Sequence, residues 1–97
     1  MSKKLWSVFT NDMDHCIFTG SPYVERHHIF GGANRSISER YGFVVPLRYD
    51  LHPNGVRANP KYAKQIDACL KEGAQQYFEE NCGSREDFMK IFGRSYL

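Results

Sequence analysis

The chain has 97 residues and a formal net charge of +2, with 41% hydrophobic and 14% aromatic residues. This length is that of one domain, and the hydrophobic content excludes an intrinsically disordered chain. The sequence contains neither a run of 18 apolar residues nor the apolar segment of a signal peptide. We therefore expect a cytoplasmic protein without a membrane partner.

The charge is divided unevenly along the chain. Residues 24–64 hold seven Lys and Arg residues against three acidic ones, whereas residues 65–97 hold four against six. A basic middle segment favours a polyanionic partner, although this excess is small beside that of a dedicated nucleic-acid binder.

The first predicted elements are strands. Residues 5–10 and 15–20 are short runs of aromatic and β-branched residues, which predict two short N-terminal strands or extended segments. Residues 23–30 predict a further strand that ends at Gly31 and Gly32, because paired glycines interrupt regular structure.

A loop with one helical turn is predicted for residues 33–41. The next strand, at residues 42–47, has the clearest pattern, and Pro46 marks its end or an exposed edge because proline cannot donate to a ladder. A turn that contains His52 follows this strand.

Two helices complete the chain. Asn59 followed by Pro60 predicts the start of a helix that runs to about Asn81, because asparagine caps free N–H groups and proline has none to lose. Gly73 interrupts this helix, and we expect it to permit close packing against a neighbour. A capping box and a final glycine predict a second helix at residues 84–93.

The order of these elements over residues 24–81 is strand, loop, strand, turn and helix, which is a ββα arrangement. We therefore predict one α+β domain over residues 1–97, with short N-terminal strands and C-terminal helices around this core.

Three histidines in the basic segment are candidates for chemistry. Neutral imidazole ligates divalent transition metals and also takes up a proton near pH 7. His27 and His28 are adjacent, and they can share a site only if the backbone bends, which the glycine pair makes easy, or if the substrate lies between them. A metal on His27, a water activated by His28 and a second ligand from His52 would suffice for one-metal hydrolysis. The alternative is that the adjacent histidines are solvent-exposed polar residues.

The stretch RHHIFGGANRSISERYGFVVPLRYDLHPNGV, residues 26–56, resembles the small phage and prophage endonucleases of the HNH, or His-Me finger, superfamily. The similarity extends through GSREDFMKIFGRSYL and covers residues 14–97. It implies a ββα-metal core in which His27 and His52 ligate one divalent metal ion and His28 is the general base. Mg²⁺ or Mn²⁺ is the expected cofactor, with Ni²⁺ or Zn²⁺ as alternatives.

The sequence departs from this family in two ways. Many relatives hold a structural zinc with paired cysteines, whereas here Cys16 is followed three residues later by Thr19, and Arg48 stands where another cysteine is expected. The family pattern Gly-Val-His-x-Asn reads GVRAN, so Arg57 replaces a third imidazole ligand.

Four further residues accompany the histidines. Arg35 and Arg57 are candidates for binding phosphate, with solvated surface arginines as the alternative in both cases. Asp50 is a candidate for orienting the His52 imidazole from outside the ligand set. Asn54 has the same candidate role, although its position before a glycine favours a tight turn.

The first functional hypothesis is a metal-dependent DNA endonuclease that leaves a 5′ phosphate and a 3′ hydroxyl and acts as a nickase when monomeric. By the resemblance it is encoded by a phage or prophage, works in the cytoplasm of a bacterial host and has phage packaging or host proteins as further partners. The alternative is an HNH-fold binding protein with weakened catalysis that acts on a host protein or DNA. A third hypothesis is a structural metal domain without catalysis.

Overall fold

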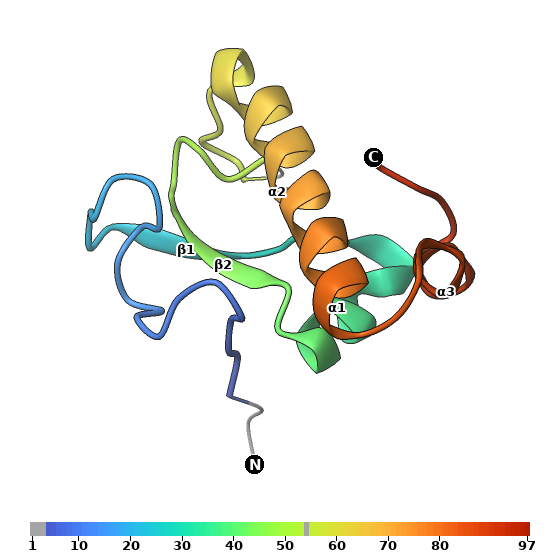
Figure 1. Ribbon diagram of the computed structural model, residues 1–97. Helices are drawn as coiled ribbons and strands as arrows, with labels where there is room; N and C mark the ends of the chain where they lie inside the picture. Colours follow the sequence, from blue (N-terminus) through green and yellow to red (C-terminus); the bar gives the residue numbers. More distant parts are fainter. Residues whose placement is uncertain (1–3, 54) are drawn as a thin grey trace.

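The computed structural model describes residues 4–53 and 55–97. Within these residues the elements, in chain order, are β1 (Val24–His28), the 3₁₀ helix η1 (Gly32–Asn34), α1 (Arg35–Tyr41), β2 (Val44–Arg48), α2 (Pro60–Asn81) and α3 (Arg85–Phe92). Figure 1 shows the long helix α2 running past the two strands, with α3 near its C-terminal end. This α+β architecture is compatible with the predicted ββα arrangement.

The strands β1 and β2 form a two-stranded antiparallel sheet. Val24 pairs with Arg48 at one end, and His28 pairs with Val44 at the other. Pro46 lies in the middle of β2, opposite Arg26. Pro46 therefore does not mark the strand's end, and it is buried, so the expectation of an exposed position is wrong; its missing N–H donor is tolerated because each strand of a two-stranded sheet is an edge strand.

The prediction of two N-terminal strands is wrong. Residues 5–10 and 15–20 form no strand, and they join the fold through single backbone bonds instead. Val8 N–H donates to Gly42 C=O at 2.9 Å, and Ile17 N–H donates to Pro46 C=O at 3.0 Å. Their apolar side chains pack against the core without pairing, because β-propensity makes a strand only where a partner strand supplies the ladder.

The predicted loop at residues 33–41 is more regular than expected, since it contains both η1 and the seven-residue helix α1. Gly42 ends α1 in the left-handed conformation, with φ of +74°. The ring of Trp6 lies directly over this glycine, where an added Cβ would come within 2.7 Å of it.

Both C-terminal helices are confirmed. The Asn59 side chain accepts from the Lys61 N–H at the start of α2, and Ser84 with Asp87 forms the capping box of α3. The expectation for Gly73 is wrong, because a Cβ added there would meet nothing within 4 Å. In residues 4–53 and 55–97, no helix has both the length and the apolar character needed to cross a membrane.

Phe30 anchors the chain where it leaves β1. Its side chain is buried, and its ring centroid lies 4.5 Å from that of Phe92 and 5.7 Å from that of Phe88. The buried Ser38 hydroxyl accepts from the Phe30 N–H at 3.0 Å and donates to the Phe30 C=O at 2.8 Å. Since both backbone groups are satisfied by a side chain, the strand can end immediately after the histidine pair.

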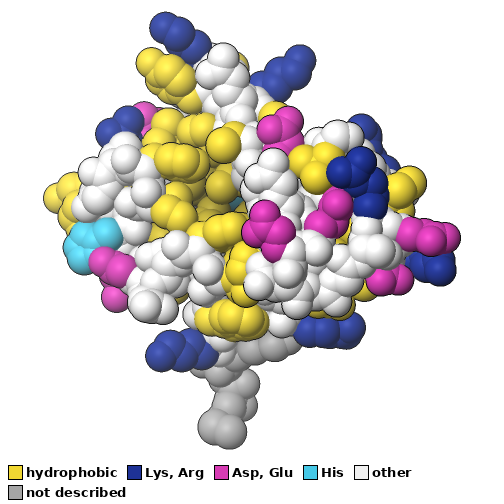
Figure 2. All heavy atoms as spheres, viewed as in Figure 1, with side chains coloured by type: hydrophobic (Ala, Val, Ile, Leu, Met, Phe, Trp, Pro, Cys, Tyr) yellow, Lys and Arg dark blue, Asp and Glu magenta, His cyan; other side chains and the backbone are white. Residues whose placement is uncertain are grey.

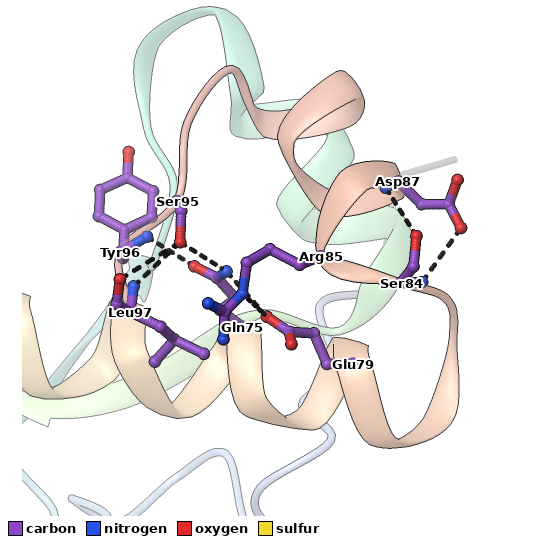
Figure 3. A network of polar contacts seen from close by, with 8 residues as sticks. All are labelled: Gln75, Glu79, Ser84, Arg85, Asp87, Ser95, Tyr96 and Leu97. Atoms are coloured by element: carbon purple, nitrogen blue, oxygen red, sulfur yellow. Dashed lines mark hydrogen bonds and ion pairs between the residues drawn. The ribbon is translucent and has the colours of Figure 1, made fainter.

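The last residues of the chain are tied to α2 by Gln75, whose side chain is fully buried. Its Nε2 donates to Glu79 Oε2 at 2.9 Å and to Ser95 Oγ at 3.0 Å, and its Oε1 accepts from Tyr96 N–H at 2.6 Å. Figure 3 shows this network, in which Arg85 of α3 approaches the same glutamate. Tyr96 is thereby held against the core.

The two glycine environments predict opposite effects of adding a methyl group. Gly73→Ala should raise the free energy of unfolding by about 0.5–1 kcal/mol, because alanine is the better helix former and the site is open. Gly42→Ala should lower it by about 1–2 kcal/mol for the left-handed backbone alone, with the Trp6 contact adding to this loss. Urea unfolding of the three proteins measures both changes, and equal midpoints would contradict the described packing.

Candidate functional site

Strand β1 presents two ionisable side chains on one face. Successive side chains in a strand alternate between faces, so Glu25 and His27, two residues apart, lie on the same side. His27 is only 2% exposed, although its neighbours in the sequence are more open to solvent. A buried imidazole at this position needs a structural or chemical reason, because buried polar groups are normally hydrogen-bonded.

His52 approaches this face from the turn that follows β2. Its ring centroid lies 5.0 Å from that of His27, and the two ring planes are inclined at 65°. Its Nδ1 lies 2.8 Å from Glu25 Oε1, which is the distance of a hydrogen bond to a carboxylate. Glu25 therefore belongs to the site, although sequence reasoning did not select it.

His28 ends β1 and faces α1. Its Nε2 is buried and lies 3.4 Å from Glu39 Oε2, close enough for an ion pair but without the geometry of a hydrogen bond. Glu39 is thus a second carboxylate that sequence reasoning missed. The spacing between Glu25 and His27 was a usable signal, whereas the separation of eleven positions between His28 and Glu39 follows no local period.

The three histidines line one cleft of about 280 Å³. Its lining residues are Arg26, His27, His28, Gly31, Gly32, Arg35 and His52. Residues 26–28 are consecutive in β1 and all line this cleft, although successive side chains of a strand alternate between faces. The structure thus brings together four of the predicted site residues, the three imidazoles and Arg35.

The other predicted residues lie elsewhere. Asp50 is held by Arg48 in a bidentate pair, with distances of 2.6 and 2.9 Å, so the place predicted for it beside His52 is taken by Glu25. Arg57 does not line the cleft; its guanidinium stacks 4.1 Å from the ring centre of Tyr49. Asn54 lies outside the described residues.

Burial controls the protonation of the histidine pair. Loss of solvent lowers the pKa of His27 to about 3, and the neighbouring positive charges of His52, His28 and Lys71 act in the same direction. The pKa of His28 is also lowered, first by burial and then by Arg35, while Glu39 opposes the shift. His27 is therefore a neutral imidazole at pH 7, as a metal ligand must be.

The site offers two imidazoles to a divalent cation. His27 Nε2 is buried, and no partner reaches it from the described part of the chain. The carboxylate at Nδ1 of His52 is the arrangement that commonly supports a metal-ligating histidine. These two side chains could supply two nitrogen ligands to a divalent ion. Within residues 4–53 and 55–97, no group of three or more His, Cys, Asp or Glu side chains is arranged to hold a metal ion. Water would therefore fill the remaining coordination positions of the ion.

A larger cleft of about 440 Å³ lies along the first half of α2 and has no histidine in its lining. The smaller cleft is the better candidate because three imidazoles line it. Figure 2 shows that on one face of the molecule Lys and Arg side chains alternate with Asp and Glu around a region of hydrophobic side chains. The basic side chains that line the histidine cleft are Arg35 and Arg26, and Arg26 pairs with Asp14 at 3.1 Å.

No protein-family model, curated protein or solved structure matches this chain. The site is therefore interpreted from its own geometry.

The lowered pKa of His27 predicts how stability depends on pH. In the unfolded chain an imidazole takes up its proton below about pH 6.5, whereas folded His27 does so only near pH 3. Between these values the unfolded state binds more protons, so the free energy of unfolding falls as the pH falls, by up to about 1.4 kcal/mol per pH unit from this group.

Urea unfolding at several pH values between about 7 and 4 measures this slope. The His27→Gln variant, which has no imidazole at this position, should show a shallower fall in stability. Ring signals of His27 in NMR spectra of the folded protein should not titrate in the same interval. Parallel slopes for the two proteins would contradict the assignment of a buried, neutral His27.

Proposed function

We propose that this protein is a metal-dependent DNA endonuclease of the HNH type, with a ββα-metal, or His-Me finger, core. The observation that carries the proposal is the single cleft lined by three imidazoles and by Arg35. A metal-ligating pair, a base and a phosphate-binding cation are the groups that phosphodiester hydrolysis requires. The resemblance of residues 26–56 to phage and prophage HNH endonucleases supports the same reaction.

His27 and His52 would hold the cation. The pKa of about 3 keeps His27 neutral at all physiological pH values, so that no proton competes for its lone pair. When bound, a divalent cation would supply Lewis-acid stabilisation of the charge that develops on the phosphate and on the departing 3′ oxygen.

His28 would be the general base. Its Nε2 is buried toward Glu39, so Nδ1 is the nitrogen left to take a proton from a water in the cleft. The Glu39 carboxylate favours the tautomer with the proton on Nε2, which leaves the lone pair on Nδ1. Because burial and Arg35 lower its pKa, His28 is neutral at pH 7 and able to accept that proton.

Arg35 would bind the scissile phosphate. It lines the cleft from the first turn of α1, and within residues 4–53 and 55–97 no carboxylate pairs with it. A guanidinium can donate two parallel hydrogen bonds to phosphate oxygens, which orients the group for attack by the water. One such cleft cleaves one strand, so we expect nicks that leave a 5′ phosphate and a 3′ hydroxyl.

A second candidate function is DNA or host-protein binding without catalysis. It is favoured by Arg57, which stands where the family has a histidine and which contacts Tyr49 and Glu25 instead of the cleft. A phage or prophage origin and work in the bacterial cytoplasm belong to both proposals.

Plasmid nicking tests the first function. Purified protein with Mg²⁺, Mn²⁺, Ni²⁺ or Zn²⁺ should convert supercoiled plasmid to the open circle, and His28→Ala should slow this by about 10²- to 10⁴-fold because the base is lost. His15→Ala is the matched control, since His15 is half exposed on the N-terminal segment and does not line the cleft.

Equal nicking by wild type and His28→Ala would contradict the proposed base. Binding of plasmid without nicking by any of the four metals would favour the second function. Circular dichroism of each variant distinguishes loss of chemistry from loss of the fold.

The role of Arg35 is tested by the salt dependence of DNA binding. Arg35→Gln should weaken binding to a short duplex and reduce the slope of log K against log salt concentration by about 1, because one phosphate contact is lost. Arg40→Gln removes the same charge from the last turn of the same helix, outside the cleft, and should leave the slope unchanged. Equal slopes for both variants would exclude Arg35 as a phosphate ligand.

A further inference from the structure

Glu25 adjoins the histidine cleft through its contact with His52, and it lies two residues before His27 on β1. It lies on β1 opposite Leu47, and its carboxylate is partly buried, with 30% of the side chain exposed. Oε1 is 2.8 Å from His52 Nδ1, and Oε2 is 3.7 Å from an Arg57 nitrogen. The two oxygens therefore face different partners, so the carboxylate is fixed from both sides.

Gly55 leaves the space in which this pair forms. A Cβ added at residue 55 would lie 2.8 Å from Glu25 Oε1, 3.1 Å from His52 Cβ and 3.2 Å from His52 Nδ1. These distances are shorter than a normal van der Waals contact, so any larger residue would displace the hydrogen bond. The backbone of Gly55 does not have a positive φ, and the need for glycine here is therefore steric, not conformational.

Arg57 closes the arrangement on the solvent side. Its guanidinium lies over the Tyr49 ring at 4.1 Å and beside Glu25 Oε2. Such stacking restricts the arginine to the side of the carboxylate that His52 does not use. Arg57, which stands where a third imidazole is expected, thus contacts the Glu25 carboxylate.

We propose that Glu25 is a positioning residue that fixes the tautomer and direction of His52, with Gly55 and Arg57 holding the carboxylate in place. Glu25 accepts the Nδ1–H of His52, so the lone pair is on Nε2 and is available to a cation. The value of this arrangement for catalysis rests on the proposed function, because it is the metal-ligand role of His52 that requires a free Nε2.

The tautomer is measured without metal or substrate. Long-range ¹H–¹⁵N NMR spectra of the metal-free protein at about pH 8, above the usual imidazole range, distinguish a proton on Nδ1 from one on Nε2. We expect His52 to carry its proton on Nδ1 in the wild type. Glu25→Ala and Gly55→Ala should both give the mixture of tautomers typical of an unconstrained imidazole, whereas Glu25→Gln should keep Nδ1–H because its amide oxygen still accepts.

Metal affinity is the second readout. Titration with Mn²⁺ should show affinity about 10- to 100-fold weaker for Glu25→Ala and Gly55→Ala than for the wild type, with Glu25→Gln in between. Glu72→Ala and Gly73→Ala are the matched controls, because both residues lie on α2 outside the cleft and the added Cβ at 73 meets nothing within 4 Å.

Two results would overturn the inference: a wild-type His52 protonated on Nε2, or a tautomer that is unchanged in both Glu25→Ala and Gly55→Ala. Failure of the proposed function gives a different pattern. In that case the tautomer still depends on Glu25, but the wild type neither binds Mn²⁺ through His27 nor nicks plasmid, and the positioning of His52 stands by itself.

Discussion

The site depends on the constraint that ends β1 directly after the histidine pair. Phe30 is fixed by its ring in the aromatic core and by the Ser38 hydroxyl, which satisfies both of its backbone polar groups. A buried backbone group without a hydrogen-bond partner costs as much free energy as a lost hydrogen bond. Ser38 avoids this cost at Phe30, where the chain leaves the strand.

Two carboxylates give the imidazoles of the cleft different environments. Glu25, two residues before His27 on β1, contacts His52, and Glu39 of α1 faces His28. His27 has no such partner within the described residues, and its burial keeps it neutral. Each histidine therefore has different surroundings, which is what the division into ligands and base in the proposed mechanism requires.

Local signals in the sequence were sufficient for the two C-terminal helices, α2 and α3, and for the paired strands β1 and β2. Asn59 with Pro60, and Ser84 with Asp87, act through hydrogen bonds to residues two or three positions away, so they can be identified without the fold. The apolar runs at residues 5–10 and 15–20 were wrongly predicted as strands, because a strand also needs a partner strand that is distant in the sequence. The open surroundings of Gly73 were likewise invisible, since they depend on which face of α2 is covered.

The sequence by itself determined α2, α3, the two paired strands and the candidacy of His27, His28, His52 and Arg35, because propensity, capping and side-chain chemistry are properties of residues and their near neighbours. Only the tertiary structure decided which carboxylate serves which imidazole. Asp50 is close to His52 in the chain but pairs with Arg48, whereas Glu25 is 27 residues away and reaches it across the sheet. The physical reason is that a hydrogen bond depends on distance and direction in space, which the pairing register and the core fix together.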